Sequence, residues 1–280
     1  MRKIVFTTST DPTFFRGTVA LCKSIRKFYP NLKEAKIVVT ANDITSGLLT
    51  EMNGARASVI AMPNVMDARK VGKAFATMAG LNEAKLGDIL IHIDSDAWLL
   101  GRLDQLLDSW EPEENDMLAW NDKNGKGVQA RHIETHLACH CVPTKFDQMK
   151  YNFNAEIILY CVGDNTKELV DDFFRCCQDP RINNDMGNQG IIRACAAKYL
   201  FEDKINFILS KDSAHYNPIW SAADAIELRE DKWFNLKTGK QQFIFHATGG
   251  KSRKIGQDKP WQRPEEWTEC VMQSLRWATQ

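Results

Sequence analysis

Short apolar runs alternate with stretches of helical periodicity along the first hundred residues. Residues 17–29 and 68–85 carry apolar side chains at helical spacing. Four apolar runs have the length and composition of β-strands, and they cover residues 3–8, 35–41, 57–62 and 88–93. Strands that alternate with helices predict an α/β fold, with a mostly parallel central sheet covered by helices on both faces.

The second half of the chain has a less regular pattern. We expect strands at 117–120, 152–162 and 241–248 and helices at 165–178 and 187–199. The last eighteen residues, 263–280, place Trp267, Val271 and Leu275 on one stripe, which predicts an amphipathic helix. The sequence contains no internal repeat and no linker, so a single domain is expected.

Composition narrows the choice of partners. Lys and Arg together number 36 and Asp and Glu 36, so the formal net charge is zero. This balance provides no general field for nucleic acid or an anionic membrane. No run reaches the length of a membrane span and the first apolar run is too short for a signal peptide, so we expect a cytoplasmic protein. The eight scattered cysteines fit a reducing compartment.

A pair of carboxylates follows the most apolar of the predicted strands. Residues 88–100 read DILIHIDSDAWLL, so Asp94 and Asp96 stand at the carboxyl end of a strand, where open α/β sheets bind ligands. Two like charges this close repel and are costly to desolvate unless a cation compensates them. A hard divalent ion such as Mg²⁺ or Mn²⁺ suits them. The alternative is a solvated strand end that caps a helix beginning near Arg102.

A histidine and a basic segment lie near the other end of the chain. His246 closes the apolar run of 241–248, and a neutral imidazole is a plausible third metal ligand. Gly249 and Gly250 permit close backbone approach, and basic residues from Lys251 to Lys259 then concentrate positive charge. Such a segment suits a diphosphate.

Five segments resemble, in chain order, those of GT-A-fold glycosyltransferases. The resemblance is strongest to glycosyltransferase family 8, which includes glycogenin and the galactosyltransferase-like enzymes, and it spans residues 4–261. The segments are FTTSTDPTFFRGTVALCKSI, HIDSDAWLLGRLDQLL with its D-x-D motif, FNAEIILY, NDMGNQGIIRA and FHATGGKSRKIGQDKPW.

The resemblance implies a GT-A, Rossmann-like domain over 1–262, with helix 263–280 packed on it. Its nucleotide-binding half would cover about 1–110 and its acceptor-side half about 111–262. The implied activity is metal-dependent transfer of a hexose from a nucleotide-diphosphate sugar, a UDP-sugar, to a glycan or other hydroxyl acceptor, with retention of configuration.

The resemblance also assigns roles to individual residues. Asp94, Asp96 and His246 would hold Mn²⁺ or Mg²⁺. The residues expected to contact the nucleotide-sugar are Thr7, Thr8, Asp11, Phe14, Lys73, Ser95, Asn154, Ala155, Gly249 and Lys259. Core packing explains Phe14 and its neighbour Phe15 equally well, and Lys73 could be an ordinary surface lysine.

The catalytic residues implied by the resemblance are Asp185, Asn188 and Gln189, and here the chain departs from the family. Asn188 stands where the family usually has aspartate, and an amide is a poor nucleophile, which disfavours a covalent intermediate at this position. Glu156 replaces a small residue beside the sugar site. Extra residues separate Gly250 from Lys259, so which basic residue contacts the phosphates stays open.

Two other functions start from the same residues. Phosphatases of the haloacid dehalogenase type also use two aspartates after an apolar strand, but there the motif opens the domain. Asn188 suggests a catalytically inactive module that binds sugar-nucleotides. The cluster HIETHLACHC at 132–141 does not have the spacing of structural zinc sites. We assign 121–150 and 211–235 to the acceptor side.

Overall fold

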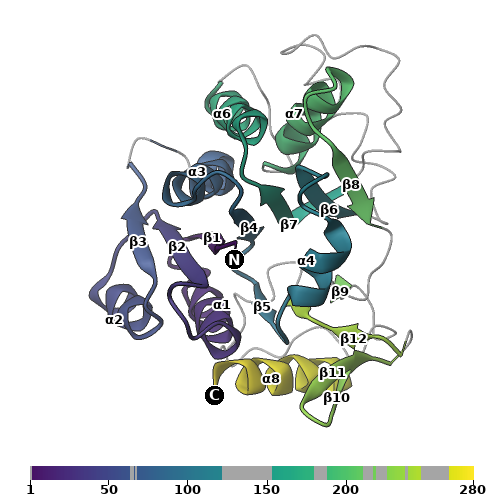
Figure 1. The fold of residues 1–280 in the computed structure, drawn as a ribbon. Helices are drawn as coiled ribbons and strands as arrows, with labels where there is room; N and C mark the ends of the chain where they lie inside the picture. Colours follow the sequence, from purple (N-terminus) through teal and green to yellow (C-terminus); the bar gives the residue numbers. More distant parts are fainter. Residues whose placement is uncertain are drawn as a thin grey trace.

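The protein is built around a seven-stranded sheet with the order β3-β2-β1-β4-β7-β6-β8 (Figure 1). The computed structural model describes residues 2–63, 66, 68–121, 153–179, 188–210, 217–218, 226–236, 239–246 and 265–280. The strands are β1 (Ile4–Thr10), β2 (Ala35–Ala41), β3 (Ser58–Ala61), β4 (Ile89–Ile93), β6 (Met117–Asn121), β7 (Phe153–Cys161) and β8 (Phe207–Ser210). All neighbouring strands pair in parallel except those beside β7, which is antiparallel to β4 and β6. The predicted mostly parallel sheet is confirmed.

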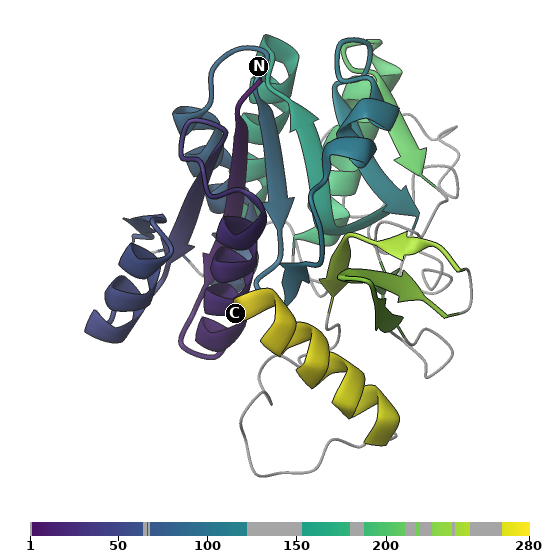
Figure 2. The same cartoon turned by 60° about the horizontal axis from the view of Figure 1, so that its bottom comes forward.

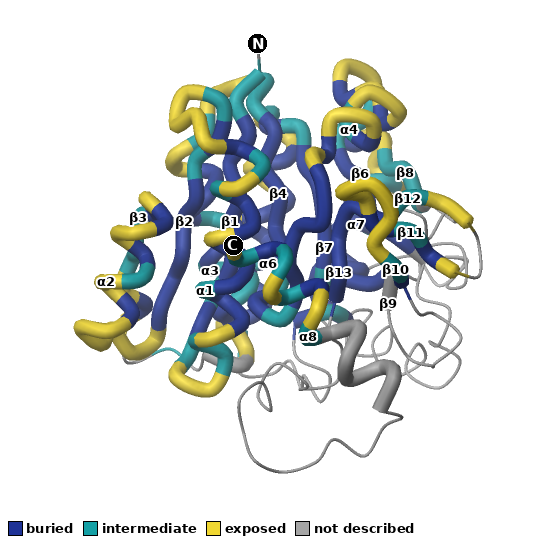
Figure 3. The backbone as a smooth tube through the Cα atoms, turned by 90° about the horizontal axis from the view of Figure 1, so that it is seen from below, coloured by how far each residue is buried: buried dark blue, intermediate teal, exposed yellow. Residues whose placement is uncertain are grey.

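Helices cover both faces of this sheet, as the alternating pattern predicts (Figure 1). One face carries α1 (Phe15–Phe28), α2 (Ser46–Gly54) and α4 (Asp104–Trp110), and the other carries α3 (Ala68–Glu83), α6 (Asp164–Gln178) and α7 (Gln189–Phe201). Successive side chains of β4 serve opposite faces: Ile91 joins the core under α1 while Leu90 joins the core under α3. The central strands β1, β2, β4 and β7 are buried along most of their length (Figure 3).

Two small three-stranded sheets extend the fold beside the main one. The first contains β5 (Ala97–Leu99), β13 (Ile244–His246) and β9 (Asn217–Pro218), and the second contains β10 (Ile226–Arg229), β11 (Lys232–Asn235) and β12 (Gln241–Gln242). The prediction of one strand at 241–248 is therefore wrong, because the chain changes sheets at Phe243. Phe243 is buried and packs in the core under α1, which explains why the apolar pattern looks continuous.

The C-terminal helix α8 (Glu265–Thr279) lies against α1 (Figure 2). The Nζ atom of Lys27 lies 3.7 Å from the ring centroid of Trp277, and Phe28 packs on the same ring at 5.6 Å. Trp277 also contacts Trp233 of β11 edge-on, which ties the helix to the second small sheet. Within the described part of the chain, no helix is both long and apolar enough to cross a membrane.

Candidate functional site

The D-x-D motif lies where the main sheet passes into the first small sheet. Asp94 directly follows β4, Ser95 is buried, and Asp96 directly precedes β5. The backbone N–H of Asp94 donates to the carbonyl of Glu156 in β7 at 2.8 Å, which extends the β4–β7 pairing by one residue. The motif thus stands at the carboxyl end of a central strand, as the sequence predicts.

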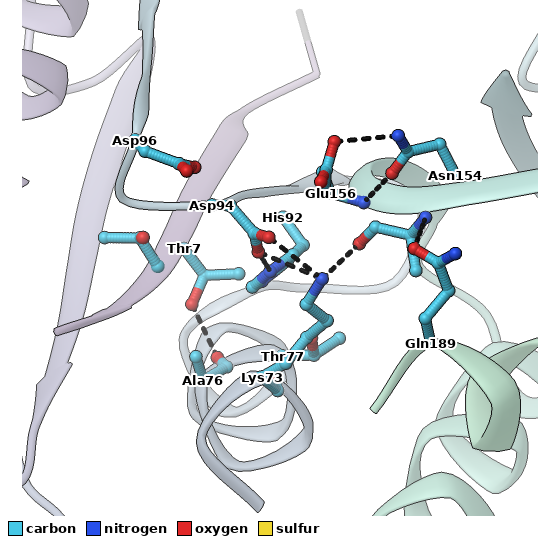
Figure 4. A network of polar contacts seen from close by, with 12 residues as sticks. Thr7, Lys73, Ala76, Thr77, His92, Asp94, Asp96, Asn154, Glu156 and Gln189 are labelled. Carbon is cyan, nitrogen blue, oxygen red and sulfur yellow. Dashed lines mark hydrogen bonds and ion pairs between the residues drawn. The ribbon is translucent and has the colours of Figure 1, made fainter. Parts of the chain in front are cut away.

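Asp94 is held by a lysine and a histidine. The Nζ atom of Lys73, from α3, lies 3.0 Å from Oδ1 of Asp94, and Nε2 of His92 lies 3.0 Å from the same oxygen (Figure 4). Burial raises the pKa of Asp94, but Lys73 and His92 outweigh burial and hold it well below its usual range. Burial lowers the pKa of His92, so its ring is neutral and Nε2–H donates to Asp94.

Asp96 is paired with His246, which connects residues 150 positions apart. Pairing of β13 with β5 sets His246 opposite Ala97, and its Nε2 lies 3.1 Å from Oδ1 of Asp96. The other ring nitrogen, Nδ1, lies 2.8 Å from Oε2 of Glu156. Burial lowers the pKa of His246, but Glu156 and Asp96 overcome burial and raise it to about 10. The buried imidazole therefore lies between two carboxylates.

An irregularity in β7 presents Glu156 to this histidine. The register between β6 and β7 shifts between Leu118 and Trp120, and bulges of this kind redirect side chains beside active sites. Asn154 and Glu156 hold each other across the irregularity. The Asn154 amide donates to Oε2 of Glu156 at 2.7 Å, and the Glu156 N–H donates to Oδ1 of Asn154 at 2.9 Å (Figure 4).

The start of α7 reaches the same site through Ala155. The Nζ atom of Lys73 donates to the carbonyl of Ala155 at 2.6 Å, and the N–H of Ala155 donates to Oε1 of Gln189 at 3.4 Å (Figure 4). The structure therefore brings together eight of the residues nominated from sequence: Lys73, Asp94, Ser95, Asp96, Asn154, Ala155, Gln189 and His246. Asn188, the residue before α7, is buried, and its Oδ1 lies 3.8 Å from Sγ of Cys177 in α6.

The nominated residues after β1 have structural partners of their own. Thr7 donates its hydroxyl to the carbonyl of Ala76 in α3 at 2.5 Å, while the buried Thr8 hydroxyl has no partner among the described residues. Asp11 accepts from the backbone N–H groups of Thr13 and Phe14, at 2.7 and 3.1 Å, and so organises the turn before α1. Their contacts with a nucleotide stay predictions.

Several nominated residues lie outside the described part of the chain. They are Asp185, Gly249 and Lys259, together with the His/Cys cluster at 132–141 and parts of the two acceptor-side segments. The sequence analysis assigned no role to His92 and did not predict that Glu156 contacts His246. A local signal existed for His92, since residues two apart in a strand share a face and His92 precedes Asp94 by two.

The donor set suits a divalent cation. Asp94, Asp96 and Glu156 supply three negative charges against one positive charge from Lys73, which leaves two negative charges when His246 is neutral. Two carboxylates and an imidazole match the ligands of Mn²⁺, and a metal-bound histidine usually donates its other N–H to a carboxylate, the position that Glu156 holds. Among the described residues, no group of three His, Cys, Asp or Glu side chains is already arranged to hold a metal ion. Asp94 is paired with Lys73 instead.

No protein-family model and no curated protein matches the sequence, but solved structures match the fold. The glycosyltransferase GlyE of Streptococcus pneumoniae TIGR4 matches with a TM-score of 0.52 and 18% identity, over 99% of this chain and 63% of GlyE. The chain thus spans less than two thirds of the length of GlyE.

Two further matches cover both chains almost completely. The galactosyltransferase LgtC, in complex with donor and acceptor sugar analogs, gives a TM-score of 0.55 at 15% identity over 99% of this chain and 95% of LgtC. LgtC with an active-site glutamine mutated to glutamate gives 0.51 at 14% identity over 96% and 99%. Identities this low show a shared fold and nothing more. The predicted α/β fold of the GT-A type is confirmed, because this chain shares it with these glycosyltransferases.

Proposed function

We propose that this protein is a metal-dependent glycosyltransferase, most like family 8, which transfers a hexose from a UDP-sugar to a hydroxyl acceptor with retention. The observation that carries the proposal is the meeting of Asp96 and His246, 3.1 Å apart and 150 residues distant in sequence, beside Asp94 at the end of β4. This pairing occurs in a fold shared with glycosyltransferases, at the carboxyl end of the central strands, where open α/β sheets bind ligands.

Asp94, Asp96 and His246 are the residues that would hold the metal. When bound, Mn²⁺ or Mg²⁺ supplies positive charge that neutralises the leaving diphosphate. The Lys73 ammonium contacts Asp94 and the Ala155 carbonyl, and it adds a fixed positive charge to the same edge of the site. We assign Gly249 and Lys259 to the diphosphate on the basis of the sequence resemblance.

The sugar would lie against Asn154, Ala155 and Gln189. The side chain of Gln189 accepts the N–H of Ala155, so its amide lies at the same end of the sheet as the proposed metal-binding residues. LgtC also carries a glutamine in its active site. Because Asn188 is an amide and is buried against Cys177, we propose that this position forms no covalent intermediate and that stabilisation of the leaving group supplies most of the catalysis.

Release of nucleoside diphosphate tests the proposal directly. The protein is incubated with Mn²⁺ and a panel of UDP- and GDP-sugars, with and without candidate acceptors, and with EDTA as the metal-free control. We expect hydrolysis or transfer with a UDP-sugar, its loss in EDTA, and a decrease of at least about a hundredfold in Asp94→Ala and Asp96→Ala, since metal stabilisation contributes several kcal/mol. Asp108→Ala, an aspartate at the opposite end of the sheet, is the matched control.

The two competing functions give different results in the same assay. A phosphatase would hydrolyse simple phosphate esters and leave sugar-nucleotides intact, and an inactive module would bind a UDP-sugar in a calorimeter without turnover. Either result would overturn the proposed transfer.

A further inference from the structure

Glu156 contacts one candidate metal ligand without being one of the three expected. Its Oε2 lies 2.8 Å from Nδ1 of His246 and also accepts the Asn154 amide at 2.7 Å. The family that the sequence resembles has a small residue at this position, so the carboxylate distinguishes this chain from that pattern. It therefore needs a separate explanation.

The orientation of His246 depends on which groups contact its two nitrogens. Nε2 faces Asp96, and Nδ1 can face a hydrogen-bond acceptor only on the opposite side of the ring. A carboxylate at Nδ1 keeps the proton on Nδ1, so that Nε2 is the nitrogen that would give up its proton and turn its lone pair to a metal ion on the side of Asp96. The ring is buried, so water does not replace this acceptor.

Glu156 is itself fixed from two sides. Its backbone N–H donates to Oδ1 of Asn154, and its carbonyl accepts the N–H of Asp94. A single residue therefore connects the backbone of Asp94, the side chain of Asn154 and the ring of His246. The carboxylate has a defined position before any ligand arrives.

We infer that Glu156 is a positioning residue, which accepts Nδ1–H of His246 and thereby directs Nε2 of this histidine, together with Asp96, toward the divalent cation of the proposed function. The inference rests on that function for the metal, but it concerns binding of the cation and not turnover. Asn154 belongs to the same arrangement through its amide.

Affinity for Mn²⁺ alone tests the inference. We compare wild type, Glu156→Gln and Glu156→Ala by calorimetry, and by the electron paramagnetic resonance of bound Mn²⁺, which reports a nitrogen ligand. We expect Glu156→Ala to bind Mn²⁺ about 10- to 100-fold more weakly, with Glu156→Gln between it and wild type because the amide oxygen still accepts Nδ1–H. Glu83→Gln, which alters a glutamate paired with Lys36 at the far end of α3, should bind as wild type does.

A double-mutant cycle separates positioning from a general effect on the fold. If Glu156 acts through His246, then adding Glu156→Ala to His246→Ala leaves the affinity of that single variant unchanged, whereas independent effects multiply. Wild-type affinity in Glu156→Ala, multiplicative effects in the cycle, or a wild-type protein that binds no Mn²⁺ would each overturn the inference. Normal Mn²⁺ binding without turnover of any sugar-nucleotide would instead refute the proposed function, and the comparison of the Glu156 variants would still decide the inference.

Discussion

The ammonium of Lys73 and the carboxylate of Asp94 form an ion pair at 3.0 Å between α3 and the end of β4. Their side chains are 13% and 29% exposed, so the pair is only partly shielded from water. Two carboxylates of like charge can stand at this strand end because the chain supplies a cation to each. Lys73 compensates Asp94, and His246 compensates Asp96.

Removal of the lysine charge should destabilise the metal-free protein. Lys73→Met leaves Asp94 without its cation, and we expect the free energy of unfolding in EDTA to fall by about 1–3 kcal/mol, between the values for exposed and buried ion pairs. Mn²⁺ should raise the melting temperature more in this variant than in wild type, because a divalent ion replaces the lost charge. Equal shifts in both proteins would contradict this account. Lys70→Met, one turn earlier on the same helix, is the control.

Binding of Mn²⁺ should release a proton from His246. Its pKa is raised to about 10 in the metal-free protein, so the ring is protonated at pH 7 and must lose a proton before Nε2 binds the metal. The apparent affinity should therefore rise about tenfold per pH unit between pH 6.5 and 8. Calorimetry in two buffers of different ionisation enthalpy measures the protons released, and a value near zero would exclude His246 as a ligand.

The same histidine gives the metal-free protein a pH-dependent stability. Its folded pKa, about 10, lies above the ordinary value of 6.5, so the folded state binds the proton more tightly. The stabilisation is complete below about pH 6.5 and is lost as the pH rises through 10. In urea titrations with EDTA, the gap between wild type and His246→Gln should narrow from pH 6.5 to pH 10. A constant gap would count against this ionisation.

Close packing of α3 on the sheet should make Gly80 intolerant of a side chain. A Cβ at this position would lie 2.5 Å from Cδ1 of Leu90 and 3.1 Å from Cβ of Thr7. We expect Gly80→Ala to cost about 1–3 kcal/mol in unfolding free energy, the range for overpacked cores. Gly54→Ala is the matched control, because no atom lies within 4 Å of its Cβ, and it should be neutral or slightly stabilising. Equal stabilities for the two variants would show that α3 adjusts freely.

Local patterns in the sequence were sufficient to predict the helices and strands that bury a continuous apolar face. The strand predicted at 35–41 matches β2 residue for residue, because all but one of its side chains are buried. The helix α2 was missed because only Leu48 and Met52 of its nine residues are buried, although Thr45 caps it through the N–H of Leu48. The strand predicted at 241–248 failed because apolar character does not reveal a change of sheet.

Residues of the candidate site could be nominated from the sequence, but the contacts between them could not be predicted from it. The D-x-D spacing and the resemblance nominated Asp94, Asp96 and His246, and strand pairing then set His246 beside Asp96. No local pattern indicates that Glu156 reaches His246, because this contact depends on an irregular register in β7 and on β13 joining β5. Contacts of this kind arise from tertiary structure.

The passage of the chain from β4 of the main sheet to β5 of the first small sheet divides the two aspartates between two structural units. Asp94 is tied to the main sheet by the carbonyl of Glu156 and to α3 by Lys73, whereas His246 belongs to the backbone ladder of β5 and β13 and Asp96 directly precedes β5. Only Ser95 separates the units along the motif. Any rotation of the small sheet against the main one would therefore move Asp96 and His246 as a pair relative to Asp94. The distance between the two carboxylates would report such a rotation.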